Sequence, residues 1–96
     1  MKIKLDVPNY SPQQGFRIEY EDEYTIEAQI KDGVAIVKAD YGGLVTLARS
    51  LLTLAQSSVP VGYYANLDEW SGLEAGSCRI SFVKREEAPG TTGRGS

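Results

Sequence analysis

The sequence contains no histidine and a single cysteine, Cys78. Without histidine, the chain lacks the usual general base and the commonest metal ligand. One cysteine cannot form an internal disulfide or a zinc site that needs several thiolates. We therefore expect no metal ion and no cofactor. Cys78 occupies an inward position of a predicted strand, so we expect a plain buried thiol there.

A strong charge of one sign and long apolar runs are also missing. The 96 residues carry 10 basic and 13 acidic side chains, which give a formal net charge of −3. This balance argues against a protein that coats nucleic acid or an anionic membrane. No stretch approaches the roughly 20 apolar residues of a membrane span, and residues 1–10 lack the apolar core of a signal peptide. We expect a cytoplasmic protein.

The length and composition are those of one small globular domain. Hydrophobic residues make up 42% of the chain and charged residues 24%, which are ordinary globular values. We predict a single domain over residues 1–86. From residue 87 to residue 96 glycine, proline and polar residues replace the large apolar ones, so we expect a disordered tail there.

Alternation of apolar and polar residues predicts strands at residues 2–7, 16–20, 24–30, 63–67 and 78–83. The segment 16–20 is either a short strand or the first half of a bent one. Asp32 and Gly33 follow the clearest strand and predict a tight hairpin turn. The next run, residues 34–37, is apolar on both faces, and we expect a central strand that a helix covers on one side.

One amphipathic helix is predicted over residues 44–56. Asp40 is a plausible N-cap, and Pro60 follows at the distance of a stop signal. The apolar residues fall within a half-cylinder, which suits a helix lying on a sheet. We expect this face to bury Leu44, Leu47, Leu51 and Leu54 or their immediate neighbours. The opposite face, which we expect in solvent, holds Thr46, Arg49, Ser50, Thr53 and Gln56.

The element order β-β-β-α-β-β predicts a two-layer α+β domain. Its antiparallel sheet of about five strands should carry the helix on one face. Such a sheet leaves free edges, so a homodimer is open to the chain. Tyr20, Tyr24 and Val83 could close it by edge pairing or by face packing.

Catalysis has little support in this sequence. A nucleophilic cysteine or serine needs a base, and the usual one is absent. Asp68 and Glu69 are adjacent carboxylates on a loop, where solvated side chains are the alternative to acid–base chemistry. Gly42 and Gly43 could expose backbone N–H groups to an anion, but no lysine follows them and Asp40 would repel phosphate. We expect a non-enzymatic protein with a tight turn at the glycines.

Carboxylates and aromatic residues gather in two segments that suggest protein recognition. The acidic stretch, residues 19–23, is either a solvated strand end that discourages edge pairing or a face for a basic protein partner. Trp70 is either a lid over the core or an anchor in a partner's pocket. Six tyrosines are present as well. The candidate partner-binding residues are Glu19, Glu21, Asp22, Glu23, Tyr64, Asp68, Glu69 and Trp70.

The second half of the chain resembles the bacterial immunity protein 32 family, which comprises predicted antidotes encoded beside polymorphic toxins. The similarity lies in residues 43–56 (GLVTLARSLLTLAQ) and 59–62 (VPVG), then in Asn66-Leu67-Asp68, Gly72-Leu73 and Gly76-Ser77. The Pro-x-Gly and Leu-Asp spacing is its more specific part. Histidines often precede the Leu-Asp pair in that family, whereas this chain has Tyr64 and Asn66.

This resemblance implies a non-enzymatic inhibitor that binds a toxin domain and blocks its active site or its substrate path. A basic toxin domain would suit the acidic residues of this chain. The alternative function is a small regulatory or housekeeping domain that associates with itself. No residue of the family is carried over as a toxin contact, so the candidate residues rest on their own chemistry alone.

Overall fold

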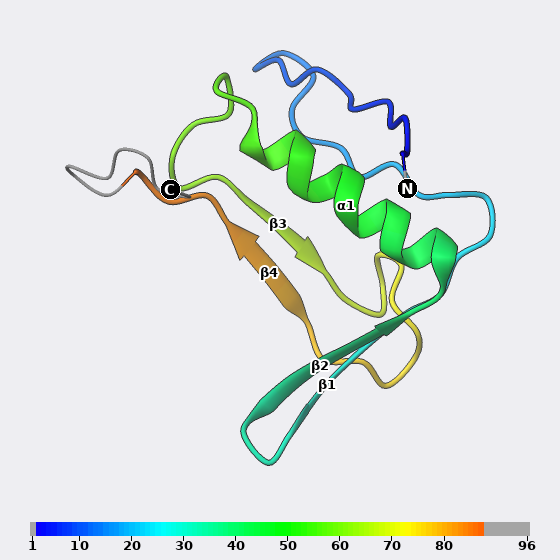
Figure 1. The fold of residues 1–96 in the computed structure, drawn as a ribbon. Coiled ribbons are helices and arrows are strands. Elements are labelled where there is room, and N and C mark those ends of the chain that lie inside the picture. Colours follow the sequence, from blue (N-terminus) through cyan, green and yellow to red (C-terminus); the bar gives the residue numbers. More distant parts are fainter. Residues whose placement is uncertain (1, 88–96) are drawn as a thin grey trace.

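The computed structural model describes residues 2–87, and along them four strands and one helix follow one another. In chain order these elements are β1 (Ile26–Lys31), β2 (Val34–Ala39), α1 (Tyr41–Ala55), β3 (Tyr64–Leu67) and β4 (Ile80–Val83) (Figure 1). The chain therefore has a small α+β fold, as predicted at this coarse level. Of the predicted tail, all but residue 87 lies outside the described residues.

The prediction of a single five-stranded sheet is wrong. The strands form two separate two-stranded antiparallel sheets, β1–β2 and β3–β4. Residues 2–7 and 16–20 are extended without belonging to either sheet. Side chains of α1 bind their backbone instead, since Arg49 donates to the carbonyl oxygens of Asp6 and Glu19. In residues 16–20 the alternation reflects a chain half-buried on one side, which does not require a neighbouring strand. In residues 2–7 the apolar side is only partly covered, since Ile3 is 51% exposed.

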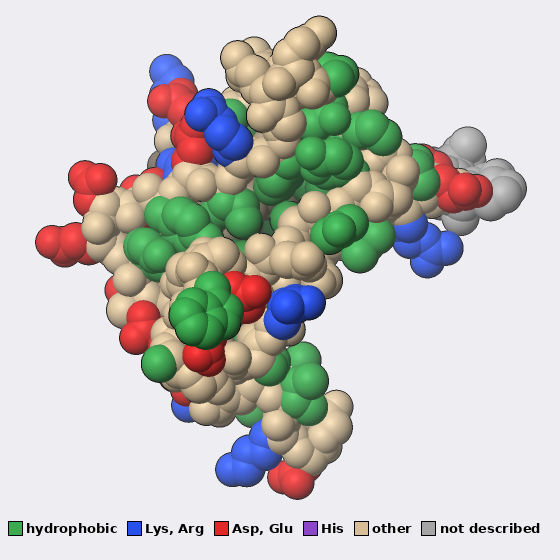
Figure 2. All heavy atoms as spheres, turned by 180° about the vertical axis from the view of Figure 1, so that it is seen from behind, with side chains coloured by type: hydrophobic (Ala, Val, Ile, Leu, Met, Phe, Trp, Pro, Cys, Tyr) green, Lys and Arg blue, Asp and Glu red, His purple; other side chains and the backbone are tan. Residues whose placement is uncertain are grey.

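The hairpin β1–β2 confirms the turn predicted at Asp32 and Gly33. These residues have φ values of 51° and 77°, the left-handed conformations that a two-residue type I′ turn requires. The prediction of a covered central strand is wrong, however. Within residues 2–87 β2 pairs with β1 alone, and Val34 and Val37 are exposed. The hairpin projects from the body as an arm (Figures 1 and 2).

The core lies where the base of this arm meets the second hairpin. Its buried residues are Ile26, Ala28, Leu67 and Leu73, and Leu47, Ile80 and Phe82 pack against them. The loop before β4 joins the two sheets through the backbone. The Glu74 N–H donates to the Ile26 carbonyl at 2.8 Å, and the Cys78 N–H donates to the Ala28 carbonyl at 2.9 Å. Cys78 is half-buried rather than fully buried.

Helix α1 begins three residues before its predicted start, and Asp40 caps it as expected. The Asp40 carboxylate accepts the Gly43 N–H at 2.8 Å. A Cβ at Gly42 would lie 1.9 Å from the carbonyl oxygen of Glu23, and one at Gly43 would lie 2.2 Å from that of Thr25. The glycines therefore let the helix end approach the chain that enters β1.

The rotation of α1 is the reverse of the predicted one. Leu44, Leu51 and Leu52 are 57%, 43% and 50% exposed, although Leu54 is buried and Leu47 half-buried as expected. The face predicted to meet solvent is covered, and its hydroxyl residues Thr46, Ser50 and Thr53 are at most 3% exposed. We call this polar side the inner face. The outer face consists of Tyr41, Leu44, Ala48, Leu51, Leu52 and Ala55, all exposed.

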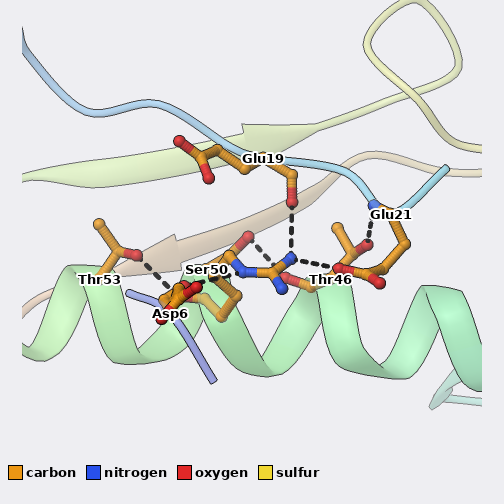
Figure 3. A network of polar contacts seen from close by, with 7 residues as sticks. Asp6, Glu19, Glu21, Thr46, Ser50 and Thr53 are labelled. Atoms are coloured by element: carbon orange, nitrogen blue, oxygen red, sulfur yellow. Dashed lines mark hydrogen bonds and ion pairs between the residues drawn. The ribbon is translucent and has the colours of Figure 1, made fainter. Parts of the chain in front are cut away.

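The inner face is polar because an extended segment covers it. The backbone of residues 6–21 needs hydrogen-bond partners that a sheet would otherwise supply. Thr46 Oγ1 accepts the Glu21 N–H at 3.0 Å, and Arg49 lies 2.7 Å from the Glu21 carboxylate (Figure 3). The Ser50 and Thr53 hydroxyls bond to carbonyls one turn earlier in α1. Every polar group of this face is thereby satisfied on burial.

Candidate functional site

An open groove of about 580 Å³ runs between residues 16–24 and β3. Phe16, Tyr20 and Tyr24 stand on one side of it, and Tyr63 and Tyr64 on the other. We call these five residues the aromatic groove. The face drawn in Figure 2 shows hydrophobic side chains gathered across its upper half and acidic side chains along its left edge.

Tyr20 connects the two segments that the sequence singled out. Its ring stacks on Tyr24 with 4.8 Å between centroids, and its hydroxyl donates to the Ser71 carbonyl. Gly72 lets the loop approach closely, since a Cβ there would lie 2.6 Å from the Tyr20 oxygen. Burial is the main cause that raises the pKa of Tyr20, and the nearby Tyr24 and Asp68 raise it further. Tyr20 therefore joins the acidic stretch 19–23, of which it is a part, to the loop 68–71.

Asp68 organises the loop that carries Trp70. Its carboxylate accepts the Ser71 hydroxyl at 2.9 Å and the backbone N–H groups of Ser71 and Trp70 at 3.0 and 3.1 Å. The Ser71 hydroxyl is the main reason why the pKa of Asp68 lies below its usual range, and Arg79 adds to the effect. The turn holds Trp70 in solvent, where it is 91% exposed. Trp70 is therefore not a lid over the core.

The remaining candidate residues divide by their partners. Glu21 faces Arg49 and belongs to the contacts of α1, so little of its charge is available to a partner. Glu19 lies 3.9 Å from Arg17. Asp22, Glu23 and Glu69 are exposed, and in the described part of the chain no ion pair holds them. Tyr64 is exposed on the far wall of the aromatic groove.

The edge of β3 that faces the groove offers free backbone groups. The Lys84 N–H donates to the Tyr63 carbonyl at 2.9 Å, so Tyr63 and Lys84 form one of the hydrogen-bonded residue pairs of the antiparallel ladder. Alternation along an antiparallel ladder then turns the N–H and C=O groups of Tyr64 and Asn66 away from β4. Among residues 2–87, no backbone hydrogen bond joins that edge to residues 16–20.

Of the five aromatic residues of the groove, the sequence pointed to Tyr64 alone as a binding residue. Tyr20 lies within the acidic stretch and Tyr24 follows it, and for these two the sequence suggested a dimer contact without singling them out as binding residues. Phe16 and Tyr63 were predicted as strand residues. A usable signal was the alternation of residues 16–20, which places Phe16 and Tyr20 on one side of an extended chain. Their meeting with Tyr63 depends on tertiary packing, which local patterns do not reveal.

Other chemistry finds little support among residues 2–87. No group of three or more potential metal ligands occurs there, and none of its helices has the length and apolar content that crossing a membrane requires. The carbonyl oxygens of Glu23 and Thr25 crowd the start of α1, where an anion would otherwise rest. No family model, curated protein or solved structure matches the chain.

Proposed function

We propose that the chain is a non-enzymatic binding protein that neutralises a bacterial toxin domain by direct contact. Its contact surface combines the aromatic groove with the loop 68–71. The observation that carries the proposal is the exposure of Trp70, a large side chain held in solvent by the Asp68 turn. Tryptophan is among the residues most enriched at binding hot spots, and a fixed loop conformation lowers the entropy lost on binding.

The charge around the groove favours a basic partner. Asp22 and Glu23 lie along the chain between the groove residues Tyr20 and Tyr24, and Glu69 lies in the loop 68–71. All three are exposed, and in the described chain no ion pair holds them. Carboxylates at the rim of an interface act mainly on the rate of association, because they attract an oppositely charged surface before contact. The groove would then supply the desolvated aromatic contacts that slow dissociation.

The free edge of β3 suggests how a partner segment would lie in the groove. An extended segment added beside Tyr64 and Asn66 would pair with their outward backbone groups. The tyrosine rings on either side would contact alternate side chains of that segment. Such a contact combines sequence-independent backbone pairing with selective side-chain pockets.

The similarity of residues 43–77 to the immunity family supports a toxin as the partner. The two positions where that family often has histidine are Tyr64 and Asn66, which lie on this edge. We infer that the chain recognises a different toxin surface from its histidine-bearing counterparts. The catalytic alternative has less support, because the Asp68 carboxylate is already bound within its own loop.

The proposal predicts a toxin gene beside the gene of this chain, and the test is co-expression with the toxic domain of that toxin, followed by binding measurements on the purified pair. The wild-type chain should restore growth. Trp70→Ala should weaken binding by at least about 2 kcal/mol, mostly through faster dissociation. Asp22→Lys with Glu23→Lys should slow association and weaken its salt dependence. Val34→Ser, at an exposed apolar site on the arm β1–β2, is the control and should bind normally.

Two results would contradict the proposed function or its contact surface, and a third would move that surface to the arm. One is the absence of protection when both proteins are produced and folded. The other is binding that Trp70→Ala and the paired lysine substitutions leave unchanged, since the recognition face would then lie elsewhere. Loss of binding in Val34→Ser alone would assign recognition to the arm.

A further inference from the structure

The outer face of α1 has the residue spacing of a helix–helix seam. Tyr41, Leu44, Ala48, Leu51 and Ala55 follow one another at intervals of three and four residues. This spacing keeps one line of side chains on a single side over the whole helix and is the pattern by which two helices pack together. All five residues are exposed. Ile3 and Leu5 lie beside the first half of this face and leave it open to solvent.

The outer face also lacks charge. Arg49 is the single charged residue within Tyr41–Ala55, and its guanidinium binds the Asp6 and Glu19 carbonyls on the inner face. A partner that recognises charge would therefore find nothing to pair with. Contiguous exposed apolar surface of this kind marks an interaction site for another apolar surface.

The order of large and small residues is complementary to itself when reversed. Counted from Ala48, Leu44 and Leu52 stand equally far before and after it, as do Val45 and Leu51. At the two ends the large Tyr41 has the small Ala55 as its counterpart. Two copies of α1 that run antiparallel across Ala48 would thus set each large end residue against a small one. A parallel pair would set Tyr41 against Tyr41.

A cavity supplies a second sign of the same arrangement. It measures about 270 Å³, opens beside the first half of the helix and is lined by Ile3, Leu5, Tyr41, Leu44, Val45 and Ala48. Leu51 and Leu52 project from the second half of the same face. In an antiparallel pair, the leucines of each copy lie over the cavity of the other. One chain therefore carries both halves of an isologous contact.

We propose that the outer face of α1 binds a second copy of this chain, with the two helices antiparallel and Ala48 on the two-fold axis. The contact shares no residue with the aromatic groove or with the loop 68–71. It does not rest on the proposed function, and each copy keeps its groove free. A dimer of this kind would present two identical binding sites.

The first experiment measures the molecular mass of the full chain by sedimentation equilibrium over a wide concentration range. We expect the mass to rise to twice that of one chain. Ala48→Glu places two carboxylates against each other on the axis and should return the mass to that of one chain with an unchanged circular dichroism spectrum. Ile30→Asn, at an exposed apolar position of the arm, is the matched control and should remain dimeric.

Cysteine crosslinking tests the orientation without disturbing the fold, in a Cys78→Ser background. Ala48→Cys should form a disulfide dimer with itself on oxidation. Ala55→Cys should not, but an equimolar mixture of Tyr41→Cys and Ala55→Cys should crosslink. A chain that stays monomeric at every concentration, or a dimer that Ala48→Glu leaves intact, overturns the proposal. So does a dimer lost in Ile30→Asn, or self-crosslinking by Ala55→Cys alone.

Discussion

The two faces of α1 differ in a way that reverses the usual amphipathic helix. The inner face buries hydroxyl groups and the Arg49 guanidinium beneath residues 6–21, whereas the outer face leaves leucines in solvent. The difference follows from what covers each side. An extended segment without strand partners brings unpaired N–H and C=O groups to the helix, and polar side chains can satisfy them.

A hydrophobic pattern therefore identifies the apolar side of a helix without saying which side its own domain covers. Fully burying a leucine side chain is worth about 1.5–3 kcal/mol, a gain that the outer face largely forgoes in the isolated chain. A second copy on that face would recover part of it. If the proposed dimer forms, the polar inner face serves the fold of one chain and the apolar outer face serves association.

The largest expected effect comes from a pair of leucine substitutions on opposite sides of α1. Leu54→Ala removes a buried side chain and should lower the free energy of unfolding by about 2–5 kcal/mol. Leu51→Ala should cost less than about 1 kcal/mol at concentrations where the chain is monomeric, because Leu51 already contacts solvent. Urea unfolding monitored by circular dichroism compares them. Equal losses in dilute solution would mean that α1 is turned the other way.

Arg49 tests the inner face, since it joins three points of the N-terminal segment. Its guanidinium donates to the Asp6 carbonyl at 3.0 Å and to the Glu19 carbonyl at 3.2 Å, and pairs with the Glu21 carboxylate. Arg49→Ala should lower the free energy of unfolding by about 1.5–3 kcal/mol. Arg49→Lys keeps the charge but loses the planar fork, so it should recover only part of the loss.

For Arg49, hydrogen exchange provides the control, because the effect should be local. Amide protons near Glu21 should exchange faster in Arg49→Ala, whereas those of the hairpin β1–β2 should change little. If Arg49→Ala were as stable as the wild-type chain, residues 6–21 would not depend on the helix for their placement.

Gly42 tests the close approach that fixes the start of α1. Alanine normally favours a helix over glycine by about 1 kcal/mol. At this position its Cβ would meet the Glu23 carbonyl oxygen, so Gly42→Ala should instead lower the free energy of unfolding by about 1–3 kcal/mol. Thermal unfolding measures the sign directly. A stabilised variant would show that the helix end does not touch this segment.

The sequence predicted those elements whose signals are local. Asp40 as a cap, the Asp32-Gly33 turn and the strand ending at Leu67 depend on neighbours a few residues away, and all three are present. The sheet partners of residues 2–7 and 16–20 depend on distant chain, and there the alternation was misleading. Alternation and amphipathicity describe two sides of a segment, but tertiary packing decides what lies against each side.

The candidate site shows the same division between local and distant signals. The exposed Trp70 and its Asp68 turn follow from a short polar loop, and the sequence indicated both residues. Glu21 was placed on the recognition face because its neighbours are acidic, yet Arg49 draws it to the helix. Its distance along the chain from Arg49 hid this pairing. Tyr20, which joins the acidic stretch to the loop, was missed for the same reason.

The smallest expected effect concerns Asp40, which ties the start of α1 to the residue that precedes β1. Its carboxylate accepts the Thr25 N–H at 2.9 Å as well as that of Gly43. Both bonds lower the pKa of Asp40 below its usual value of 3.8, and the bond from Thr25 has the larger effect. The folded chain therefore binds fewer protons at this group than the unfolded chain.

It follows that the ionised Asp40 stabilises the fold at neutral pH and that this contribution fades as the pH falls through the usual carboxyl range. Asp40→Asn keeps the cap acceptor without the charge. The variant should be less stable than the wild-type chain at pH 7, and the difference should shrink toward pH 3. Urea midpoints of both chains across this range measure it. A difference that stays constant with pH would mean that the charge of Asp40 does not stabilise the helix start.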